Sequence, residues 1–315
     1  MRFVSVLLLL LAVPLPIWGQ NSVDQQLYHF LLLERQGQFA SAIPGLQSIA
    51  DSGTFSHVEQ GRAWTILGIA CKETGQFQQA QSAFEKAINL FEGDAQHQSD
   101  LANALDFSAE LYQSIGQTQI AGKMWSRVLT IYEKKEDHRA LMKTYAHLAA
   151  NELERKHSRA ARALMGKAMA ETTSSLSDDD RAFLCDTQGW IDEKTGHVAE
   201  SISDYQLALE LWKKGHGEEH QYTGWRYLLL GNAYAANGEP DRGIMTMRQG
   251  LTILDHTAGS QSMRYLTGEI MYARVLHRYG RRTEAAQLKA EATQQIKALY
   301  SNQCINCTVS VSSFR

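Results

Sequence analysis

A pattern of large apolar residues, glycines and alanines recurs in this chain about every 40 to 42 residues. It is clearest in the stretch WTILGIACKETGQFQQAQSAFEKAI, from Trp64 to Ile88. One apolar helical face ends there at Gly75, and a second begins at Phe77. Each copy predicts one helical hairpin, which cannot bury its apolar face alone and must stack on its neighbours. The sequence therefore predicts an elongated stack of hairpins.

Further copies of this pattern cover most of the chain. Four follow the first, at residues 105–128, 145–168, 189–208 and 227–250, and weaker copies lie at 272–292 and 33–49. Apolar residues at helical spacing connect the copies, and no run alternates as a strand would. Beyond residue 19 the only prolines are Pro44 and Pro240, and Pro44 falls inside or at the start of a helix. We expect an all-α chain of about seven hairpins.

The residues at these positions resemble the tetratricopeptide repeat, as shown by Trp64, the pair Leu67 and Gly68, Ala80 and Phe84. The period exceeds the 34 residues of the standard unit. Stretches such as ALELWKKGHGEEHQYTGWRYLLLGNAYAANGEPDRGI resemble the longer repeats of the kinesin light chain. The resemblance implies a right-handed α-solenoid of stacked antiparallel helix pairs. It implies no particular partner, because members of the family share the scaffold and bind different proteins.

The small residues of the pattern have predicted roles in packing. Gly68 and Ala80 should lie where the two helices of a hairpin come closest, and Gly75 should form the tight turn between them. A bulky residue at Gly68 should cost about 1 to 3 kcal/mol through overpacking. Lys156 departs from the pattern, since it stands where the turn glycine of its copy is expected.

The first residues, MRFVSVLLLLLAVPLPIWGQ, read as a secretory signal peptide with a basic start, an apolar core and a small residue before the cut. The apolar run is shorter than the roughly 20 residues of a membrane span. We expect an exported protein, periplasmic or extracellular, with no membrane span after cleavage; an uncleaved anchor is the alternative. The predicted division is 1–19 signal peptide, 20–60 degenerate first hairpin, 61–300 about six repeats, and 301–315 a tail with Cys-x-x-Cys.

Charge and motifs exclude several classes of function. The net charge is −3 and the pI is about 6.4, which gives no reason to expect a nucleic-acid partner. The chain lacks a His-Glu-x-x-His helix, a phosphate-binding loop and a nucleophile elbow. We therefore predict no enzymatic activity, no cofactor and no metal site. The segment HGEEH, His216 to His220, comes nearest to a metal cluster and is interpreted as a solvated polar loop.

The four cysteines fall into two groups. Cys71 and Cys185 occupy aromatic positions of their repeats and are predicted to be small buried apolar residues. Cys304 and Cys307 follow the last helix and are candidates for a local disulfide, or else unpaired in the tail. A redox pair or half of a zinc site is an alternative interpretation of their spacing.

Stacked hairpins should leave a concave groove lined by the first helix of each pair. Phase counting places fourteen residues in this candidate peptide-binding groove: Arg62, Thr65, Lys72, Asn103, Asp106, Glu110, Lys143, His147, Asp186, Trp190, Trp225, Asn232, Arg274 and Arg278. The set is chemically mixed. Trp190 and Trp225 form an aromatic shelf for an apolar peptide side chain, or pack against neighbouring repeats.

The sequence predicts a scaffold that binds a protein or peptide segment in this groove and supports the assembly of complexes. A self-associating structural component of the cell envelope is the main alternative. The polar residues Lys289, Gln294, Gln295 and Lys297 of the last helix look like a solvated cap, which disfavours end-to-end assembly. A metal-dependent enzyme built on HGEEH is a third hypothesis, which no feature of the repeats supports.

Overall fold

The structure, a computed structural model, describes residues 23–35, 38–172 and 176–301. The predicted signal peptide and the tail with Cys304 and Cys307 lie outside the described residues. Within the described part all regular structure is helical, as predicted. The fourteen helices are α1 Val23–Arg35, α2 Phe39–Ala50, α3 His57–Glu73, α4 Phe77–Phe91, α5 Gln98–Ser114, α6 Thr118–Lys135, α7 His138–Glu154, α8 Ser158–Ala170, α9 Asp178–Thr195, α10 Val198–His216, α11 Gln221–Ala236, α12 Pro240–Ala258, α13 Met263–Arg278 and α14 Arg282–Ser301.

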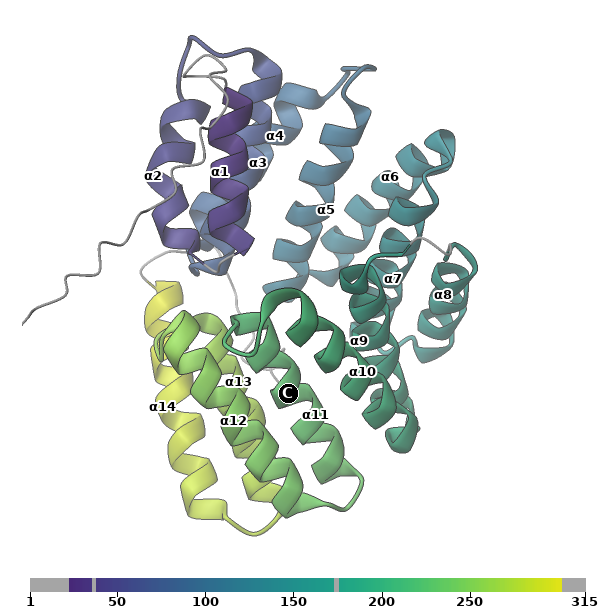
Figure 1. Ribbon diagram of the computed structural model, residues 1–315, viewed down its shortest axis with the longest axis vertical. Coiled ribbons are helices and arrows are strands. Elements are labelled where there is room, and N and C mark those ends of the chain that lie inside the picture. The colour runs from purple at the N-terminus through teal and green to yellow at the C-terminus, as the bar shows by residue number, and fades with distance from the viewer. Residues whose placement is uncertain (1–22, 36–37, 173–175, 302–315) are drawn as a thin grey trace, which may run out of the picture.

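Consecutive helices pair into seven antiparallel hairpins that stack side by side, and this confirms the predicted α-solenoid (Figure 1). From the second hairpin on, the first helices begin 40 to 43 residues apart. The repeats are therefore of the long kind that the sequence indicates. Pro44 lies inside α2.

The two ends of the solenoid meet. In Figure 1 the chain runs to the right from the N-terminal hairpins through α5–α8, and then returns below to the left, so that α13 and α14 lie beneath α1–α3. Leu266 and Ile270 of α13 and Ala292 and Ile296 of α14 belong to the same buried core cluster as Leu27, Phe39, Leu46 and Trp64. Apolar burial therefore closes the superhelix upon itself, which the repeat pattern alone does not predict.

The turns inside the last six hairpins share one geometry. A glycine with φ between +79° and +91° closes five of them: Gly75, Gly116, Gly196, Gly238 and Gly280. In the sixth, Lys156 adopts φ +66°, and its N–H donates to the carbonyl of Leu153 at 2.9 Å. The left-handed turn therefore forms without glycine, at a steric cost to the lysine.

Replacing Lys156 with glycine is expected to stabilise the protein by about 0.5 to 1 kcal/mol. The left-handed conformation costs an L-residue about 1 to 2 kcal/mol, and the greater chain entropy of unfolded glycine offsets part of the gain. Urea unfolding followed by circular dichroism measures the change. Lys156→Ala is the control, because it removes the charge and keeps the strain; an equal gain from alanine would contradict the backbone explanation.

Packing inside the hairpins partly corrects the predicted role of the small residues. A Cβ atom at Gly68 would lie 2.5 Å from Cε1 of Phe84, so this glycine makes room for an aromatic ring and not for the backbone beside Ala80. Backbones do approach closely in the α11–α12 hairpin. There a Cβ atom at Gly243 would lie 2.6 Å from the carbonyl oxygen of Gly231.

Candidate functional site

Charged side chains from six of the first helices, α3, α5, α7, α9, α11 and α13, lie on the inner side of the closed superhelix. These helices contact one another, as α3 contacts α5, α7 contacts α9 and α11 contacts α13. The predicted groove residues lie on them: Arg62, Thr65 and Lys72 on α3; Asn103, Asp106 and Glu110 on α5; Lys143 and His147 on α7; Asp186 and Trp190 on α9; Trp225 and Asn232 on α11; Arg274 and Arg278 on α13. The structure brings only some of them together.

Lys72 lies at the centre of this inner cluster. Its ammonium donates to Oε2 of Glu110 at 2.6 Å and lies 3.4 Å from Oε1 of Glu73. Burial alone would lower the pKa of Lys72, but the carboxylates of Glu110 and Glu73 outweigh it and raise that pKa. The ammonium is therefore firmly charged, although its side chain is mostly buried.

His147 faces the two carboxylates of α5. Its Nε2 lies 3.8 Å from Oδ1 of Asp106 and 3.7 Å from Oε1 of Glu110. The imidazole stacks on the Trp125 ring with centroids 5.2 Å apart, and the Trp125 indole N–H donates to Asp106 at 2.7 Å. Burial raises the pKa of Asp106 above its usual range. The nearest basic group to Asp106 is the His147 imidazole, whereas Glu110 and Glu73 each lie 2.6 Å from a lysine or an arginine.

Asp106, Glu110 and His147 present three ligand atoms within 4.8 Å of one another and could in principle hold a metal ion. The surroundings disfavour one. The Lys72 ammonium already donates a hydrogen bond to Glu110, and the positive charge of Lys143 acts to lower the pKa of Asp106. A divalent cation here would be repelled by two ammonium groups in a site shielded from water. The arrangement suits a single positive charge, such as an amine or a guanidinium, better than a metal.

Two arginines extend the cluster toward the C-terminal hairpins. Arg264 of α13 donates to Oε2 of Glu73 at 2.6 Å, and its guanidinium lies 4.8 Å from the centroid of the Tyr222 ring. Arg226 forms an ion pair with Asp186 and lies over the Trp212 ring at 4.1 Å. These contacts join α3 to α13 and α9 to α11. The Arg264–Glu73 contact supplies the polar part of the closure between the two ends of the solenoid.

Lys143 belongs to a neighbouring ion-pair group. Its ammonium lies 2.9 Å from Oδ1 of Asp180, and Arg139 donates to Oδ2 of the same carboxylate at 2.6 Å. Burial alone would raise the pKa of Asp180, but the bonds from Arg139 and Lys143 hold it well below its usual range. The carboxylate therefore keeps one cation if the other is removed.

Other predicted groove residues serve local structure. The Thr65 hydroxyl is buried and donates to the carbonyl of Gly61, Arg62 pairs with Asp100 at 2.9 Å, and Asn232 donates to Glu193. Asn103 accepts a hydrogen bond from the Tyr132 hydroxyl at 3.1 Å. Arg274 is half-buried and Arg278 is exposed.

The two tryptophans do not share one shelf. Trp190 packs against the core clusters around Leu184 and Tyr205, whereas Trp225 packs against the cluster around Leu228. Both are half-buried. Their contacts therefore agree with the alternative interpretation, in which both tryptophans pack against neighbouring repeats.

The HGEEH segment is only in part the solvated loop that the sequence predicts. Gly217 to Glu219 form a loop in which Gly217 and Glu219 are exposed. His216 ends α10, and its ring packs against Trp212 and His220 with centroids 4.3 and 5.2 Å away. His220 is buried and accepts a hydrogen bond from the N–H of Tyr222, so the two histidines belong to a packed aromatic stack.

The two described cysteines differ. Cys71 is buried, as predicted, and burial raises the pKa of its thiol to about 11. Cys185 is half-buried, since its side chain borders a cleft of about 510 Å³ lined also by Leu184 and Asp204. Burial raises the pKa of the Cys185 thiol to about 11 as well, so neither thiol is activated.

Sequence reasoning missed Glu73, Tyr222, Arg226 and Arg264. Glu73 follows the groove residue Lys72, and Arg226 follows Trp225, so one helical step of error in phase counting hid both. Arg264 carries no local signal, because its partner lies 191 residues away.

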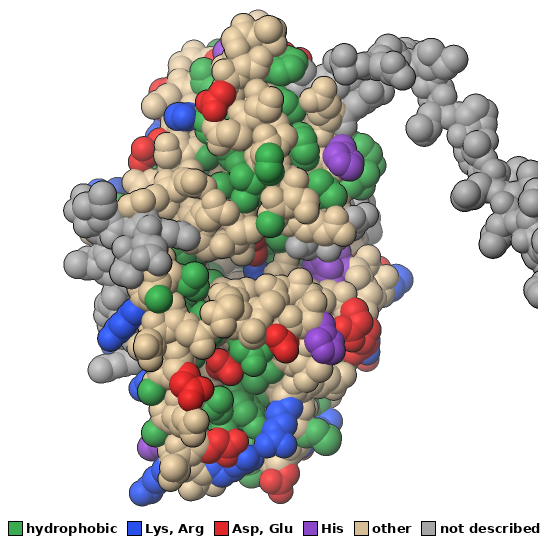
Figure 2. Space-filling model, turned by 90° about the vertical axis from the view of Figure 1, so that its left-hand side faces the viewer, with side chains coloured by type: hydrophobic (Ala, Val, Ile, Leu, Met, Phe, Trp, Pro, Cys, Tyr) green, Lys and Arg blue, Asp and Glu red, His purple; other side chains and the backbone are tan. Residues whose placement is uncertain are grey.

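The surface gives a second view of the closure. On the face shown in Figure 2, a recess separates the upper and lower halves, and charged side chains gather mainly on the lower half.

Among the described helices, none has the length and apolar character that a membrane crossing requires.

Residues 61–94 match the family model of the tetratricopeptide repeat, which corresponds to the α3–α4 hairpin. No protein of curated function matches the sequence. The solved structure of a Rap protein complexed with Competence and Sporulation Factor has a TM-score of 0.68 and 16% identity, covering 91% of this chain and 90% of that one.

Two further solved structures have the same fold. NprR in complex with its cognate peptide NprX has a TM-score of 0.65 and 12% identity, over 92% of this chain and 84% of that one. The Rap conjugation gene regulator of the plasmid pLS20, in complex with a Phr peptide, has a TM-score of 0.61 and 12% identity, over 93% of each chain. At these identities the likeness concerns the fold, which is a stack of tetratricopeptide-type repeats.

Proposed function

We propose that this tetratricopeptide-repeat chain is an exported scaffold that binds a protein or peptide segment on its inner face and supports the assembly of a complex. The observation that carries the proposal is the inner cluster of Lys72, Asp106, Glu110 and His147. These ionisable side chains face inward from three first helices and belong to no apolar core. The fold is also that of NprR and the plasmid Rap regulator, whose structures contain bound peptides.

The charges of the cluster indicate what the bound segment offers. Asp106 and Glu110 lie on one face of α5, and the nearest basic group to Asp106 is His147 at 3.8 Å. A Lys, an Arg or an N-terminal ammonium of the segment can pair there, and the desolvated position strengthens the attraction. The proposed ligand is therefore a segment that presents a basic group to α5.

End-to-end self-association is less consistent with the structure, because the two ends of the solenoid already contact each other. The terminal helices that an end-to-end polymer would use already bury Ile270 and Ile296 with the N-terminal hairpins of the same chain. Lys289, Gln294 and Lys297 are exposed on α14, as expected for a solvated cap, whereas Gln295 is half-buried and does not fit that expectation. The enzyme hypothesis loses its site, because His216 and His220 are packed in the aromatic stack.

The variant Asp106→Asn tests the proposal. It removes the carboxylate charge that would pair with the basic group of the segment and keeps an acceptor for the Trp125 indole N–H. Peptides enriched from a display library on the wild-type protein should bind this variant at least tenfold more weakly, since a central contact of this kind is worth about 1.4 kcal/mol or more. Asp241→Asn is the matched control on the second helix α12, where the side chain is exposed.

Equal peptide binding by Asp106→Asn and Asp241→Asn, or no enrichment at all, would contradict inner-face recognition. A cross-linked pull-down from the native envelope and extracellular fractions should recover one partner with the wild-type protein and the control. Recovery of only the protein itself would favour self-association instead. Detection of the chain solely inside the cell, with its first 19 residues attached, would contradict the proposed export.

A further inference from the structure

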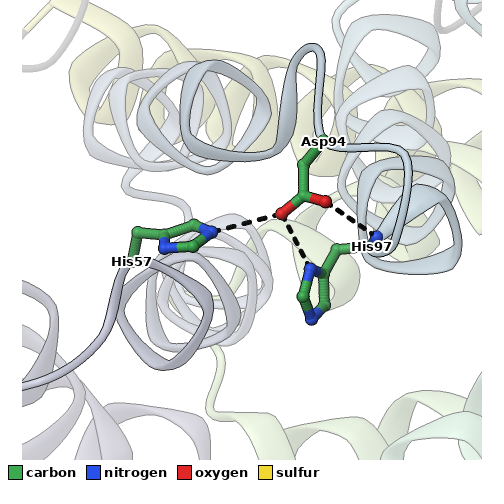
Figure 3. Close-up of side chains that lie close together, drawn as sticks. All are labelled: His57, Asp94 and His97. Carbon is green, nitrogen blue, oxygen red and sulfur yellow. Dashed lines mark hydrogen bonds and ion pairs between the residues drawn. The ribbon is translucent and has the colours of Figure 1, made fainter.

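Two histidines and an aspartate converge at one edge of the solenoid, away from the inner cluster. His57 is the first residue of α3, and Asp94 and His97 lie in the loop between α4 and α5. Figure 3 shows both imidazoles directed at the same carboxylate. Nε2 of His57 lies 3.2 Å and Nδ1 of His97 lies 2.7 Å from Oδ2 of Asp94. The three ligand atoms lie within 4.8 Å of one another.

The backbone holds this carboxylate in place. Oδ1 of Asp94 accepts the N–H groups of Gln96 at 2.9 Å and His97 at 3.3 Å, so Oδ2 is turned toward the two rings. The hydrogen bonds from His57 and His97 hold the pKa of Asp94 well below its usual range. Hydrogen bonds from groups that do not themselves bind the metal orient a metal ligand and stabilise its charged form.

One imidazole and one carboxylate recur elsewhere along the same edge. His138, the first residue of α7, lies 2.7 Å from Glu171, and His216 lies 3.0 Å from Asp179. A single such pair links the start of a first helix to the exit of its own hairpin. His220 holds the place of His97 beside the second pair and packs against His216, but among the described residues neither pair has a third ligand atom within 4.8 Å. A structural link alone therefore does not explain the direction of His97.

We infer that His57, Asp94 and His97 bind a divalent transition metal ion, with Zn²⁺ as the best match. Two imidazoles and a carboxylate are ligands that Zn²⁺ takes at about 2.0 to 2.2 Å, with further positions left to water. Tetrahedral ligands at that radius lie about 3.3 to 3.5 Å apart. To reach that range, the distance from Asp94 Oδ2 to Nε2 of His57 would have to lengthen by a few tenths of an ångström from 3.2 Å. The distance from Oδ2 to Nδ1 of His97 would have to lengthen by somewhat over half an ångström from 2.7 Å.

The site differs from the inner group of Asp106, Glu110 and His147 in its charge environment. The groups that act on Asp94 are the two histidines and backbone amides, whereas Lys72 and Lys143 act on the inner carboxylates. The bound ion would join the start of α3 to the α4–α5 loop. It would thereby clamp two neighbouring hairpins together at their outer edge.

Zinc titration of purified full-length protein by calorimetry tests the inference. All proteins carry Cys304→Ser and Cys307→Ser, so that the tail thiols do not compete. One Zn²⁺ should bind per chain, and His97→Gln should weaken that binding at least tenfold, in line with the loss seen when even outer partners of a metal are removed. Zinc should also raise the melting temperature of the parent protein and not that of His97→Gln.

His138→Gln is the matched control, since it removes an imidazole from a pair that lacks a third ligand. It should bind zinc as tightly as the parent. His57→Gln provides a second variant of the site, and circular dichroism without metal checks that each variant is folded. Absence of stoichiometric binding by the parent, or equal losses in His97→Gln and His138→Gln, would overturn the site.

Discussion

Replacing Gly243 with valine is expected to lower the free energy of unfolding by about 3 kcal/mol, at the upper end of the usual cost of overpacking. A Cβ atom there would lie 2.6 Å from the carbonyl oxygen of Gly231 and 2.8 Å from the amide nitrogen of Ala235. Both are backbone atoms of α11, which a rotamer change cannot move aside. The two helices would have to separate, and the α11–α12 contact would lose its close fit.

The measurement is urea unfolding of the wild-type protein and the variant, followed by far-ultraviolet circular dichroism. Gly166→Val is the matched control, because Gly166 is an exposed helical glycine with no atom within 4 Å of an added Cβ. That change should be neutral or slightly stabilising. Similar destabilisation by both valines would show that valine destabilises these helices even where it has room, and would contradict the close-approach explanation.

The repeat architecture could be predicted because its determinants are local. A turn glycine such as Gly75 and its flanking apolar residues lie within one hairpin, and each hairpin contacts its sequence neighbours. The same locality explains the success at Lys156, where the pattern identified a position that still adopts the glycine conformation. Stacking of long repeats follows from these elements without knowledge of distant contacts.

What could not be predicted depends on contacts between distant segments or on side-chain direction. The closure through Glu73 and Arg264 joins α3 to α13, and no periodic pattern links those positions. The HGEEH segment was partly misread because a polar loop in sequence can still fold its histidines onto Trp212. Groove residues such as Thr65 were misplaced for a different reason, since small errors of helical phase turn a side chain from the inner face into a core.

Substituting Glu73 with glutamine is expected to lower the free energy of unfolding by about 3 kcal/mol, because it leaves the buried Arg264 guanidinium without its carboxylate and removes one of the two carboxylates beside Lys72. The Glu73 side chain is 9% exposed, and its oxygens lie 2.6 Å from Arg264 and 3.4 Å from Lys72. Glu284→Gln is the control, since the Glu284–Arg281 pair is exposed on both sides and should contribute about 0.5 kcal/mol or less. Equal effects of the two substitutions in urea unfolding would show that the closure ion pair contributes no more than a surface pair.

The pH dependence of the difference in unfolding free energy between the wild-type protein and Glu73→Gln shows whether the charge of Glu73 causes it. Burial alone would raise the pKa of Glu73, but Arg264 and Lys72 outweigh it and hold that pKa below the ordinary value of 4.5. A group with a lowered folded pKa contributes its stability above the unfolded pKa and loses it as the pH falls through the folded one. The stability gap between the wild-type protein and Glu73→Gln should therefore be full at neutral pH and shrink below about pH 4.5. A gap that stays constant across this range would mean that the glutamine acts through packing, and that the charge of Glu73 does not hold the two ends of the solenoid together.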